Sequence, residues 1–355
     1  MTSLSETSML AGSSGVTSGY TIDQSIRFNK NDNAYMSKTP SAASDGGKTY
    51  TYSWWHKRGS AIGSSSTSEY VIHTDLAGGN SADYLYFYED GFRSWHGTNN
   101  LISIRLFRDA SAWYHFVYVY DSTQTIANER IRFYVNGERQ TNFSTENYPS
   151  LNATSYFNTN TAHYIGGANS SANRLDSYLA EIQFIDGYGY GPEYFGETNE
   201  NGIWIPKEYT GSYGTNGFHI DGRDSSDLGD DESGNGNDYS TSGLAANDQK
   251  TDSPTNNHCT WNPLTGSAQV YSDGNLNAAT ASSAWKGGLT TMQVPLNSGI
   301  WYYELYVDSA GSSSGQFSVG WSQSERSMSD DNSYGDLEGW VTYAINGKTY
   351  NNASS

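Results

Sequence analysis

The carboxylates are the first candidates for chemistry, because two of them at short separation can hydrolyse a glycosidic bond. Such enzymes place the two carboxyl groups roughly 5–10 Å apart, which along one strand requires acidic residues two positions apart. Glu181 is instead followed by Gln183 and Ile185, and Glu304 lies between two tyrosines without an acidic partner. The sequence therefore predicts a protein that is not an enzyme. Polysaccharide depolymerase remains an alternative, because residues distant in sequence can converge.

Nucleophilic and zinc chemistry are also disfavoured. Residues 311–315 match the Gly-x-Ser-x-Gly pattern, but a nucleophile elbow needs a helix after the turn, and here another strand is expected. The seven histidines have no His-x-His or His-x-x-x-His spacing, and Cys259 is the only cysteine, so no structural zinc site is predicted. His115 lies within an aromatic strand and is interpreted as a packed side chain.

An acidic loop is the best candidate for metal binding. Residues 221–238 carry seven acids and one base, with Ser, Gly and Asn between them. Carboxylate and amide oxygens suit a hard cation such as Ca²⁺, although their order differs from an EF-hand loop. The interpretations are a possible Ca²⁺ site or a solvated turn, and no other cofactor is expected. The candidate ligands are Asp227, Asp230, Asp231, Asn235, Asn237 and Asp238.

Aromatic residues among short polar ones are the strongest candidates for binding. Sugar rings stack on aromatic faces, while Ser, Asn and Gly supply adaptable hydrogen bonds. Residues 91–100 and 188–194 have this composition. For any single residue the alternative is burial in the core. The candidate glycan-binding residues are Trp95, His96, Asn99, Tyr188, Tyr190 and Tyr194.

Charge and hydropathy exclude two classes of partner. The 355 residues include 19 basic and 38 acidic side chains, for a formal charge of −19. Such a chain is repelled by nucleic-acid phosphates and anionic lipid, and no stretch approaches a transmembrane helix. We therefore expect neither nucleic-acid binding nor membrane insertion. Residues 1–19 lack the charged and apolar regions of a signal peptide.

The elements that must position these residues are β-strands. The 29 tyrosines and 38 glycines favour strands and turns over helices. Residues 113–120 are apolar on both faces, which predicts a central strand covered on both sides. Residues 131–135 alternate and precede Asn136-Gly137, a strong hairpin signal. Together with strands expected at 25–29, 49–55, 84–88, 163–166 and 179–185, they predict an all-β, antiparallel β-sandwich.

Beyond residue 195 the pattern changes. A Gly/Asp-rich connector is expected, with short apolar segments at 204–206 and 217–221, followed by further strands at 300–307, 317–321 and 340–345. The predicted organisation is a flexible arm at 1–20, a sandwich at 21–195, the connector at 196–265 and part of a second sandwich at 266–355.

Five motifs in the first sandwich carry a family resemblance. In chain order they are Ser25–Phe28, Thr51–Arg58, Trp113–Phe116, Phe133–Gly137 and Leu179–Ile182. As a set they resemble the laminin-G-like group of the concanavalin A-like lectin/glucanase superfamily. The resemblance implies a concanavalin A-like jelly roll, and it carries over no catalytic or metal residue.

The connector carries a second resemblance, through Phe195–Thr198, Gly202–Lys207, Gly211–Phe218, Ser233–Asp238 and Asp252–Asn256. These segments look like a block found in marine bacteriophage structural proteins, which usually append a SPRY-like sandwich. Trp301–Glu304 and Ser318–Trp321 resemble the first half of that sandwich. The second half has no counterpart, so we expect truncation there, with completion by another chain as the alternative.

Together the resemblances imply a tail fibre, spike or other virion appendage that contacts host-surface glycan. The expected partners are a host polysaccharide or glycoconjugate, other virion proteins through residues 1–20, and copies of the same chain, with a trimer expected by analogy with fibres. The expected location is the virion surface, after assembly in the host cytoplasm. A capsid decoration or head-fibre protein without a specific ligand is the alternative from a different class.

Overall fold

The computed structural model describes residues 19–41, 44–59, 68–75, 83–167, 173–265, 269–280, 288–294, 301–307, 318–322, 339–343 and 348–351. The predicted N-terminal arm, apart from residues 19 and 20, lies outside these ranges, as do residues 311–315. All pairings between the described strands are antiparallel, and their helical turns are short 3₁₀ segments. This confirms the predicted all-β sandwich. No described helix has the length and apolar character needed to cross a membrane.

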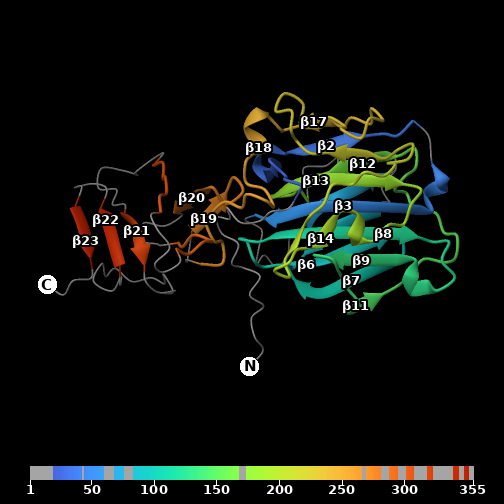
Figure 1. Cartoon of the computed structure of the whole chain (residues 1–355), viewed down its shortest axis with the longest axis horizontal. Helices are drawn as coiled ribbons and strands as arrows, with labels where there is room; N and C mark the ends of the chain where they lie inside the picture. Colours follow the sequence, from blue (N-terminus) through green and yellow to red (C-terminus); the bar gives the residue numbers. More distant parts are fainter. Residues whose placement is uncertain are drawn as a thin grey trace.

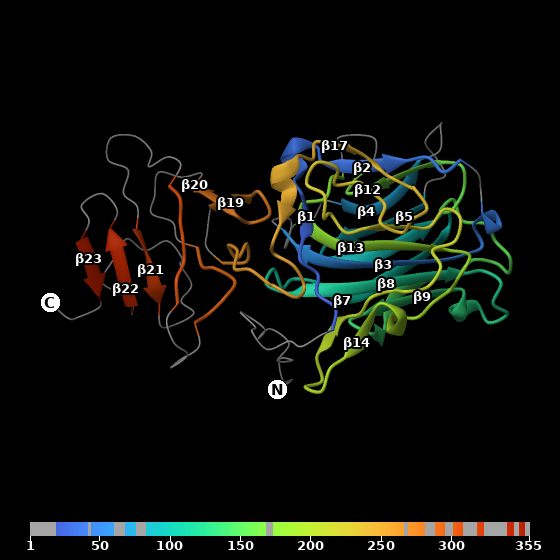
Figure 2. The same cartoon turned by 45° about the horizontal axis from the view of Figure 1, so that its top comes forward.

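Two eight-stranded sheets form the sandwich (Figures 1 and 2). Sheet A has the order β10-β9-β8-β3-β13-β1-β18, with β16 also paired to β13. Its strands are β1 (Ser25–Phe28), β3 (Thr49–Arg58), β8 (Trp113–Asp121), β9 (Ile131–Val135), β10 (Glu138–Arg139), β13 (Ser177–Asp186), β16 (Phe218–Ile220) and β18 (Gln249–Lys250).

Sheet B has the order β11-β7-β6-β5-β4-β12-β2-β17. Its strands are β2 (Tyr35–Lys38), β4 (Ser68–Asp75), β5 (Asp83–Tyr88), β6 (Gly91–His96), β7 (Asn99–Leu106), β11 (Phe143–Glu146), β12 (Ala162–Ile165) and β17 (Ser240–Ser242). The 3₁₀ segments are η1 (Lys30–Asp32), η2 (Asp45–Gly47), η3 (Ala127–Glu129), η4 (Pro192–Tyr194) and η5 (Ala246–Asp248).

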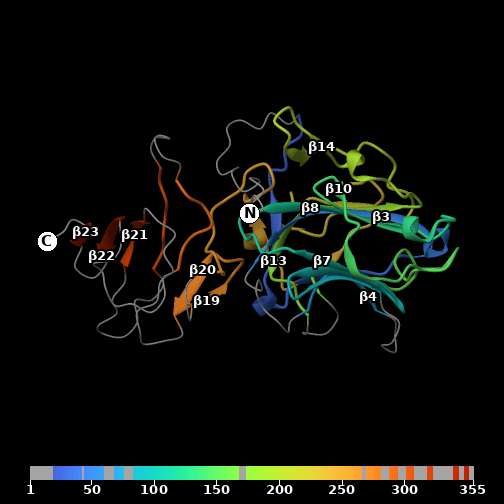
Figure 3. The same cartoon turned by 90° about the horizontal axis from the view of Figure 1, so that it is seen from below.

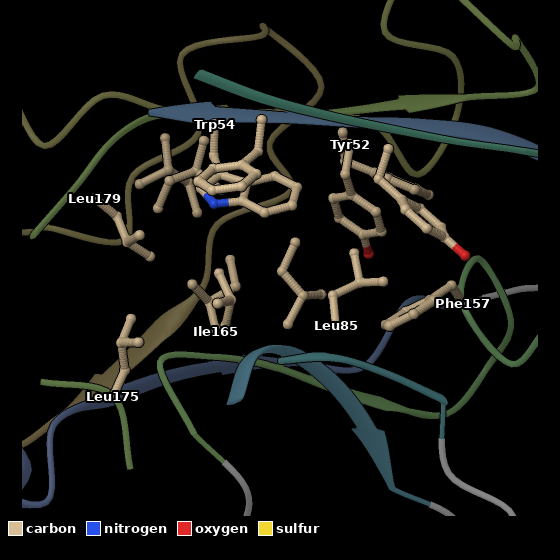
Figure 4. Close-up of a cluster of buried hydrophobic side chains, with 14 of the residues drawn as sticks. Tyr52, Trp54, Leu85, Phe157, Ile165, Leu175 and Leu179 are labelled. Carbon is tan, nitrogen blue, oxygen red and sulfur yellow. The ribbon is translucent and has the colours of Figure 1, made fainter. Parts of the chain in front are cut away.

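The main core lies between the two sheets and is mostly aromatic. Figure 4 shows Tyr52 and Trp54 of β3 facing Leu85 of β5 and Ile165 of β12. All four side chains are at most 1% exposed. They alternate with outward-facing residues along their strands, as the period of two requires. Burial of large aromatic side chains therefore compensates for the low overall hydrophobic content.

The outer face of sheet A is covered by a second layer. Val117 and Val119 of β8 are completely buried against Phe195 and Tyr209 from the segment after β13. In Figure 3 this segment, with β14 (Gly196–Thr198), lies on the side of sheet A away from sheet B. Strand β14 pairs with β15 (Trp204–Pro206) in a small separate sheet. The expectation that β8 is covered on both faces is confirmed.

The segment expected to be a connector, residues 196–265, contributes β16, β17 and β18 to the two large sheets. Its apolar side chains Phe218, Ile220 and Tyr239 are at most 4% exposed and join the main core. The sheets therefore extend well past the boundary expected at residue 195. Burial of these side chains provides the physical reason, because each would otherwise expose a large apolar surface.

A buried ion pair fixes the end of this segment. The ammonium of Lys57, with no exposed side-chain surface, lies 2.7 Å from Asp252 Oδ2. Trp113 Nε1 donates to the other carboxylate oxygen at 3.0 Å. A buried charge needs such partners because its desolvation is costly. Asp252 thus holds residues 252–258 against sheet A.

The C-terminal region contains a hairpin of β19 (Gln269–Ser272) and β20 (Asn277–Thr280), and a sheet of β21 (Ser318–Ser322), β22 (Gly339–Tyr343) and β23 (Lys348–Asn351). The strand predicted at 300–307 is wrong for its described part: residues 301–307 belong to no sheet, and Tyr302 and Tyr306 are 79% and 88% exposed. Alternation of apolar and polar residues alone therefore does not establish that a segment is a strand.

Candidate functional site

A pocket opens at one end of the sandwich, where β6 turns into β7. Its volume is about 330 Å³. The wall comes from the start of β5, the β6–β7 hairpin, the end of β8 and residues 153–156. We call it the rim pocket; it is lined by Asp83, His96, Gly97, Thr98, Asn99, Tyr120, Ala153, Thr154 and Tyr156. It brings together two predicted glycan-binding residues, His96 and Asn99.

Asp83 is held in place at the wall of the rim pocket. Its Oδ2 accepts hydrogen bonds from Ser155 Oγ at 2.6 Å and from the Tyr156 backbone N–H at 2.7 Å. His96 Nδ1 lies 2.9 Å from the same oxygen, and His96 Nε2 lies 2.7 Å from the Tyr118 hydroxyl. Asp83 and His96 are each more than 90% buried. The polar groups of this wall are therefore oriented in advance, which reduces the ordering cost of binding.

The composition of the rim pocket suits binding rather than glycoside hydrolysis. Ligand sites commonly occupy roughly 300–1,000 Å³, so the pocket is large enough for a small ligand such as a sugar ring. Thr98, Asn99 and Thr154 offer hydroxyl and amide groups, and Tyr156 offers an aromatic ring. Among the described lining residues Asp83 is the only acidic one, whereas glycosidases need two carboxyl groups.

Trp95, the third residue predicted in this segment, lies on the opposite face of β6. Successive side chains alternate along a strand, so His96 points inward while Trp95 points away from the core. Trp95 pairs across strands with Tyr84, Tyr84 with His73, and His73 with Tyr164. The structure therefore separates Trp95 from His96 and Asn99.

These outward rings form a continuous band, which we call the aromatic row. It consists of Trp95, Tyr84, Tyr70, His73, Tyr164 and Tyr35. The Trp95 and Tyr84 rings are nearly parallel, with centroids 6.1 Å apart, and Tyr84 lies 5.1 Å from Tyr70. His73 continues the row at 5.3 Å from Tyr70, and Tyr164 lies 5.8 Å from His73. Such cross-strand pairs stabilise a sheet and present aromatic surface to solvent.

The three other predicted binding residues also meet. Tyr188 and Tyr190 stack at 5.2 Å with almost parallel rings, and Tyr194 stacks on Tyr190 at 4.2 Å. Tyr188 and Tyr194, at the two ends of this column, are 45% and 42% exposed. Because the outer faces of a stacked column are free, a sugar ring could stack there. This column lies beside the cover of sheet A and shares no residue with the lining of the rim pocket.

The acidic loop is organised by its own hydrogen bonds. The Asp231 carboxylate accepts from the backbone N–H groups of His219, Ser233 and Asn237. Asp238 accepts from the Asp231 N–H, and the Asn235 side chain donates to the Gly217 carbonyl. Among the described residues, no three His, Cys, Asp or Glu side chains are grouped to hold a metal ion. A Ca²⁺ site formed by Asp227, Asp230, Asp231, Asn235, Asn237 and Asp238 stays a prediction.

His115 contacts Ser53, but the geometry does not activate the hydroxyl. Trp204 Nε1–H donates to His115 Nδ1 at 3.0 Å, and His115 Nε2 lies 2.9 Å from Ser53 Oγ. Burial lowers the pKa of His115 to about 3, so the ring is neutral at pH 7. With Nδ1 accepting, the single ring proton sits on Nε2 and is donated to Ser53. A general base would need the reverse arrangement.

Glu181 has an unusual backbone conformation. Its φ is +50°, and the pairing register with β3 shifts between Ala180 and Gln183. Its Oε2 accepts from the Tyr20 hydroxyl and lies 2.8 Å from His219 Nε2. Burial acts to lower the pKa of His219, but the hydrogen bond and charge of Glu181 outweigh it, so that pKa is raised. The bulge thus re-aims Glu181 toward the covering segment.

Residues 29–187 match a protein family described as the concanavalin A-like lectin/glucanases superfamily, Laminin_G_3. Because of this similarity, we call the segment the laminin G-like domain. The expectation from the motifs of the first sandwich is therefore confirmed for that segment. No curated protein sequence matches the chain.

Solved structures with a similar fold share little sequence with the laminin G-like domain. A native heptameric SAP-like pentraxin from Limulus polyphemus is 13% identical, with 48% of this chain and 78% of that one covered and a TM-score of 0.36. Domains LG4-5 of the mouse laminin alpha1 chain are 12% identical, with 56% and 47% covered and a TM-score of 0.34. The binding domain of Paraclostridial Mosquitocidal Protein 1 is 13% identical, with 48% and 41% covered and a TM-score of 0.33.

Several residues of these surfaces were not singled out from the sequence. Tyr156 of the rim pocket lies in another segment, more than fifty residues after Asn99. Asp83 lies at the start of β5. No local sequence pattern links either residue to Asn99. For the aromatic row, the sequence does contain a pattern from which part of it could have been predicted. Tyr84, Tyr86 and Tyr88 alternate with buried Leu85 and Phe87, so they share the outer face of β5.

Proposed function

We propose that this chain is a glycan-binding protein of a bacteriophage virion appendage, whose laminin G-like domain attaches the particle to host-surface polysaccharide. The rim pocket carries the glycan-binding part of the proposal, since it combines oriented polar groups with tyrosine rings. The appendage part is supported by the resemblance of residues 195–256 to phage structural proteins.

The proposal assigns binding without catalysis to the laminin G-like domain. Asp83 already accepts hydrogen bonds from Ser155 and Tyr156 and has no second carboxylate beside it in the pocket lining. Its role in the proposal is to orient His96 and the 153–156 segment. A bound sugar would then contact the pocket through Asn99, Thr154 and Tyr156.

The remaining parts of the chain take supporting roles in the proposal. Residues 1–20 would join the chain to other virion proteins, and residues 266–355 would form part of a SPRY-like sandwich. Copies of the chain would assemble with one another, as a trimer by analogy with fibres, and display the laminin G-like domain at the virion surface.

The test is binding of the purified chain to an array of bacterial surface glycans and to intact bacterial cells. Asn99→Ala should weaken glycan binding roughly fivefold or more, because it removes hydrogen bonds to the ligand. Asn128→Ala is the matched control, since Asn128 is exposed in η3, outside the rim pocket. Absence of binding to every glycan and every cell would overturn the proposal, and release of reducing sugar would overturn its non-catalytic part.

A further inference from the structure

The outer face of sheet B is not covered by any other described strand. In Figure 3 the covering segment lies on the far side of sheet A, and no described strand lies beyond β4 and β7. The aromatic row crosses this face from β6 to β2. Its rings are only partly buried, apart from His73 and Tyr164, which are 6% and 8% exposed. Partly exposed aromatic surface of this kind is found at interaction sites.

An unpaired arginine lies at one end of the aromatic row. The Arg174 guanidinium carbon is 4.1 Å from the centre of the Tyr35 ring. Arg174 is 7% exposed, and its Nε and Nη1 have no hydrogen-bond partner. Among the described residues no carboxylate forms an ion pair with it. Because guanidinium stays charged in proteins, the face carries a poorly hydrated positive charge without a counter-ion.

The other nearly buried cations of the sandwich are paired. Arg27 lies 2.7 Å from Asp248, Arg58 lies 2.8 Å from Glu69, and Lys57 lies 2.7 Å from Asp252. A buried charge without a partner costs stability, so Arg174 departs from the rule that this chain otherwise follows. A charge retained at such a cost on an open face calls for an anion from outside the chain.

We propose that the outer face of sheet B binds an acidic polysaccharide, with sugar rings packed along the aromatic row and a carboxylate or sulfate group held by Arg174. The inference deepens the proposed function and rests on it, since it names the class of glycan. It uses different residues from the rim pocket, so the two can fail separately.

The charge distribution favours a glycan with widely spaced anionic groups. The chain as a whole is strongly acidic, and duplex DNA, with about one charge per 1.7 Å, would be repelled. An acidic polysaccharide carries about one anion per sugar or per pair of sugars, and the sugar rings between them are uncharged. At physiological salt, repulsion from charges beyond about 8 Å is screened. Attraction to Arg174 at close range then decides binding.

The experiment measures binding of the full chain to two matched pairs of polysaccharides. Polygalacturonate is compared with its methyl ester, and κ-carrageenan with uncharged agarose. We expect one charged member to bind at least tenfold more tightly than its uncharged counterpart, and to lose affinity as salt is raised. The polygalacturonate pair reports on a carboxylate and the carrageenan pair on a sulfate.

Variants then test the role of Arg174. Arg174→Met should abolish the preference for the charged polysaccharide, a loss of roughly tenfold or more, because it removes a charge-assisted contact. Arg139→Met is the matched control, since Arg139 lies in β10 of sheet A and pairs with Glu129. The melting temperature of Arg174→Met should equal or exceed that of the wild type, because an unpaired buried charge is lost.

Two binding results would overturn the inference. One is equal binding of charged and uncharged polysaccharides by the wild type. The other is an unchanged preference in folded Arg174→Met, whether or not its melting temperature is lower. Attachment to cells that persists after periodate oxidation of their glycans, yet is lost in Arg174→Met, would indicate a protein occupant and would also overturn it. If Asn99→Ala, in which Arg174 is intact, lost all glycan binding, the rim pocket would be the only binding site. That result would also overturn the inference.

Discussion

The outer faces of the two sheets of the sandwich differ in how far they are covered. On sheet A, Val117 and Val119 are completely buried beneath Phe195 and Tyr209. On sheet B, the corresponding outward positions hold Trp95 and the other rings of the aromatic row, and no described segment covers them. The same strand alternation therefore produces a second core on one side and an open aromatic surface on the other.

The polar groups of the two faces differ in the same way. Beneath the cover of sheet A, His115 is hydrogen-bonded to Trp204 and Ser53, and Lys57 forms an ion pair with Asp252. On the open face, Arg174 has no carboxylate partner among the described residues. A covered face must satisfy its polar groups internally, whereas an open face can leave them to a ligand. In our proposal, this difference separates a structural surface from a binding surface within one domain.

The largest expected effect is loss of folding when the cover is removed. A chain that ends at residue 195 lacks β16, β17 and β18 and exposes the outer side of β8. We expect it to be insoluble or unfolded by circular dichroism, while a chain ending at residue 265 remains folded. A soluble, cooperatively melting 1–195 fragment would show that the second layer is dispensable and would remove the contrast between the faces.

Trp204→Ala should be the most damaging single change on the covered face. The ring packs against Gly137 and Gly196, and its loss leaves His115 Nδ1 unsatisfied. We expect a decrease of about 3 kcal/mol in the free energy of unfolding, measured by urea denaturation. In a His115→Phe background, Trp204→Ala should lower the free energy of unfolding by a smaller amount. An equal loss in both backgrounds would mean that the hydrogen bond from Trp204 to His115 contributes little.

Acid should weaken the domain through histidines on both faces. Burial lowers the pKa of His115 on the covered face to about 3 and that of His73 on the open face to about 4. Burial likewise lowers the pKa of His163 to about 4 and that of His56 far below its usual value. The folded state thus excludes protons that unfolded histidines bind below about pH 6.5.

Stability should therefore be complete above about pH 6.5 and fall as the pH is lowered from there toward 4. His219, whose pKa is raised, acts in the opposite direction. We expect a net loss of about 3 kcal/mol at pH 5.5, measured by urea denaturation. NMR titration would measure the pKa of each histidine and so compare the open face with the covered face. A pKa near 6.5 for His73 would mean that the aromatic row is more hydrated than its burial indicates.

The smallest effect is expected for Trp95→Ala on the open face. Its ring contacts Tyr84 and leaves no cavity in the main core, so the free energy of unfolding should fall by about 1 kcal/mol or less. Thermal melting of Trp95→Ala beside Trp204→Ala gives a direct comparison of the two faces. Equal losses in the two variants would indicate that the aromatic row is structural.

The fold could be predicted where local patterns encode burial. Residues 113–120 are apolar or aromatic on both faces of the strand, and that alone predicted coverage on both sides. The role of residues 218–220 and 239 could not be predicted, because their strands are very short and their burial depends on partners far along the chain. Residues 301–307 show the converse case, in which a clear alternation belongs to none of the described sheets.

The candidate site was predicted in part. His96 and Asn99 were chosen for their composition, and the structure places both at the rim pocket. Trp95 was grouped with them although alternation along β6 assigns it to the other face. Arg174 could not have been found, since an arginine without a partner is a property of the whole fold and not of any sequence motif.

The pairing of β1 with β18 has a consequence for biosynthesis. Ser25 lies opposite Lys250, so β1 waits during synthesis for a partner strand more than 200 residues later in the chain. At about 5–20 residues per second, that interval lasts roughly 10–45 s. Throughout it, one edge of sheet A remains open to other nascent chains, and the apolar outer side of β8 remains open until residues 195–209 have been made. Slower translation should therefore raise the fraction that aggregates, and co-expressed chaperones should lower it.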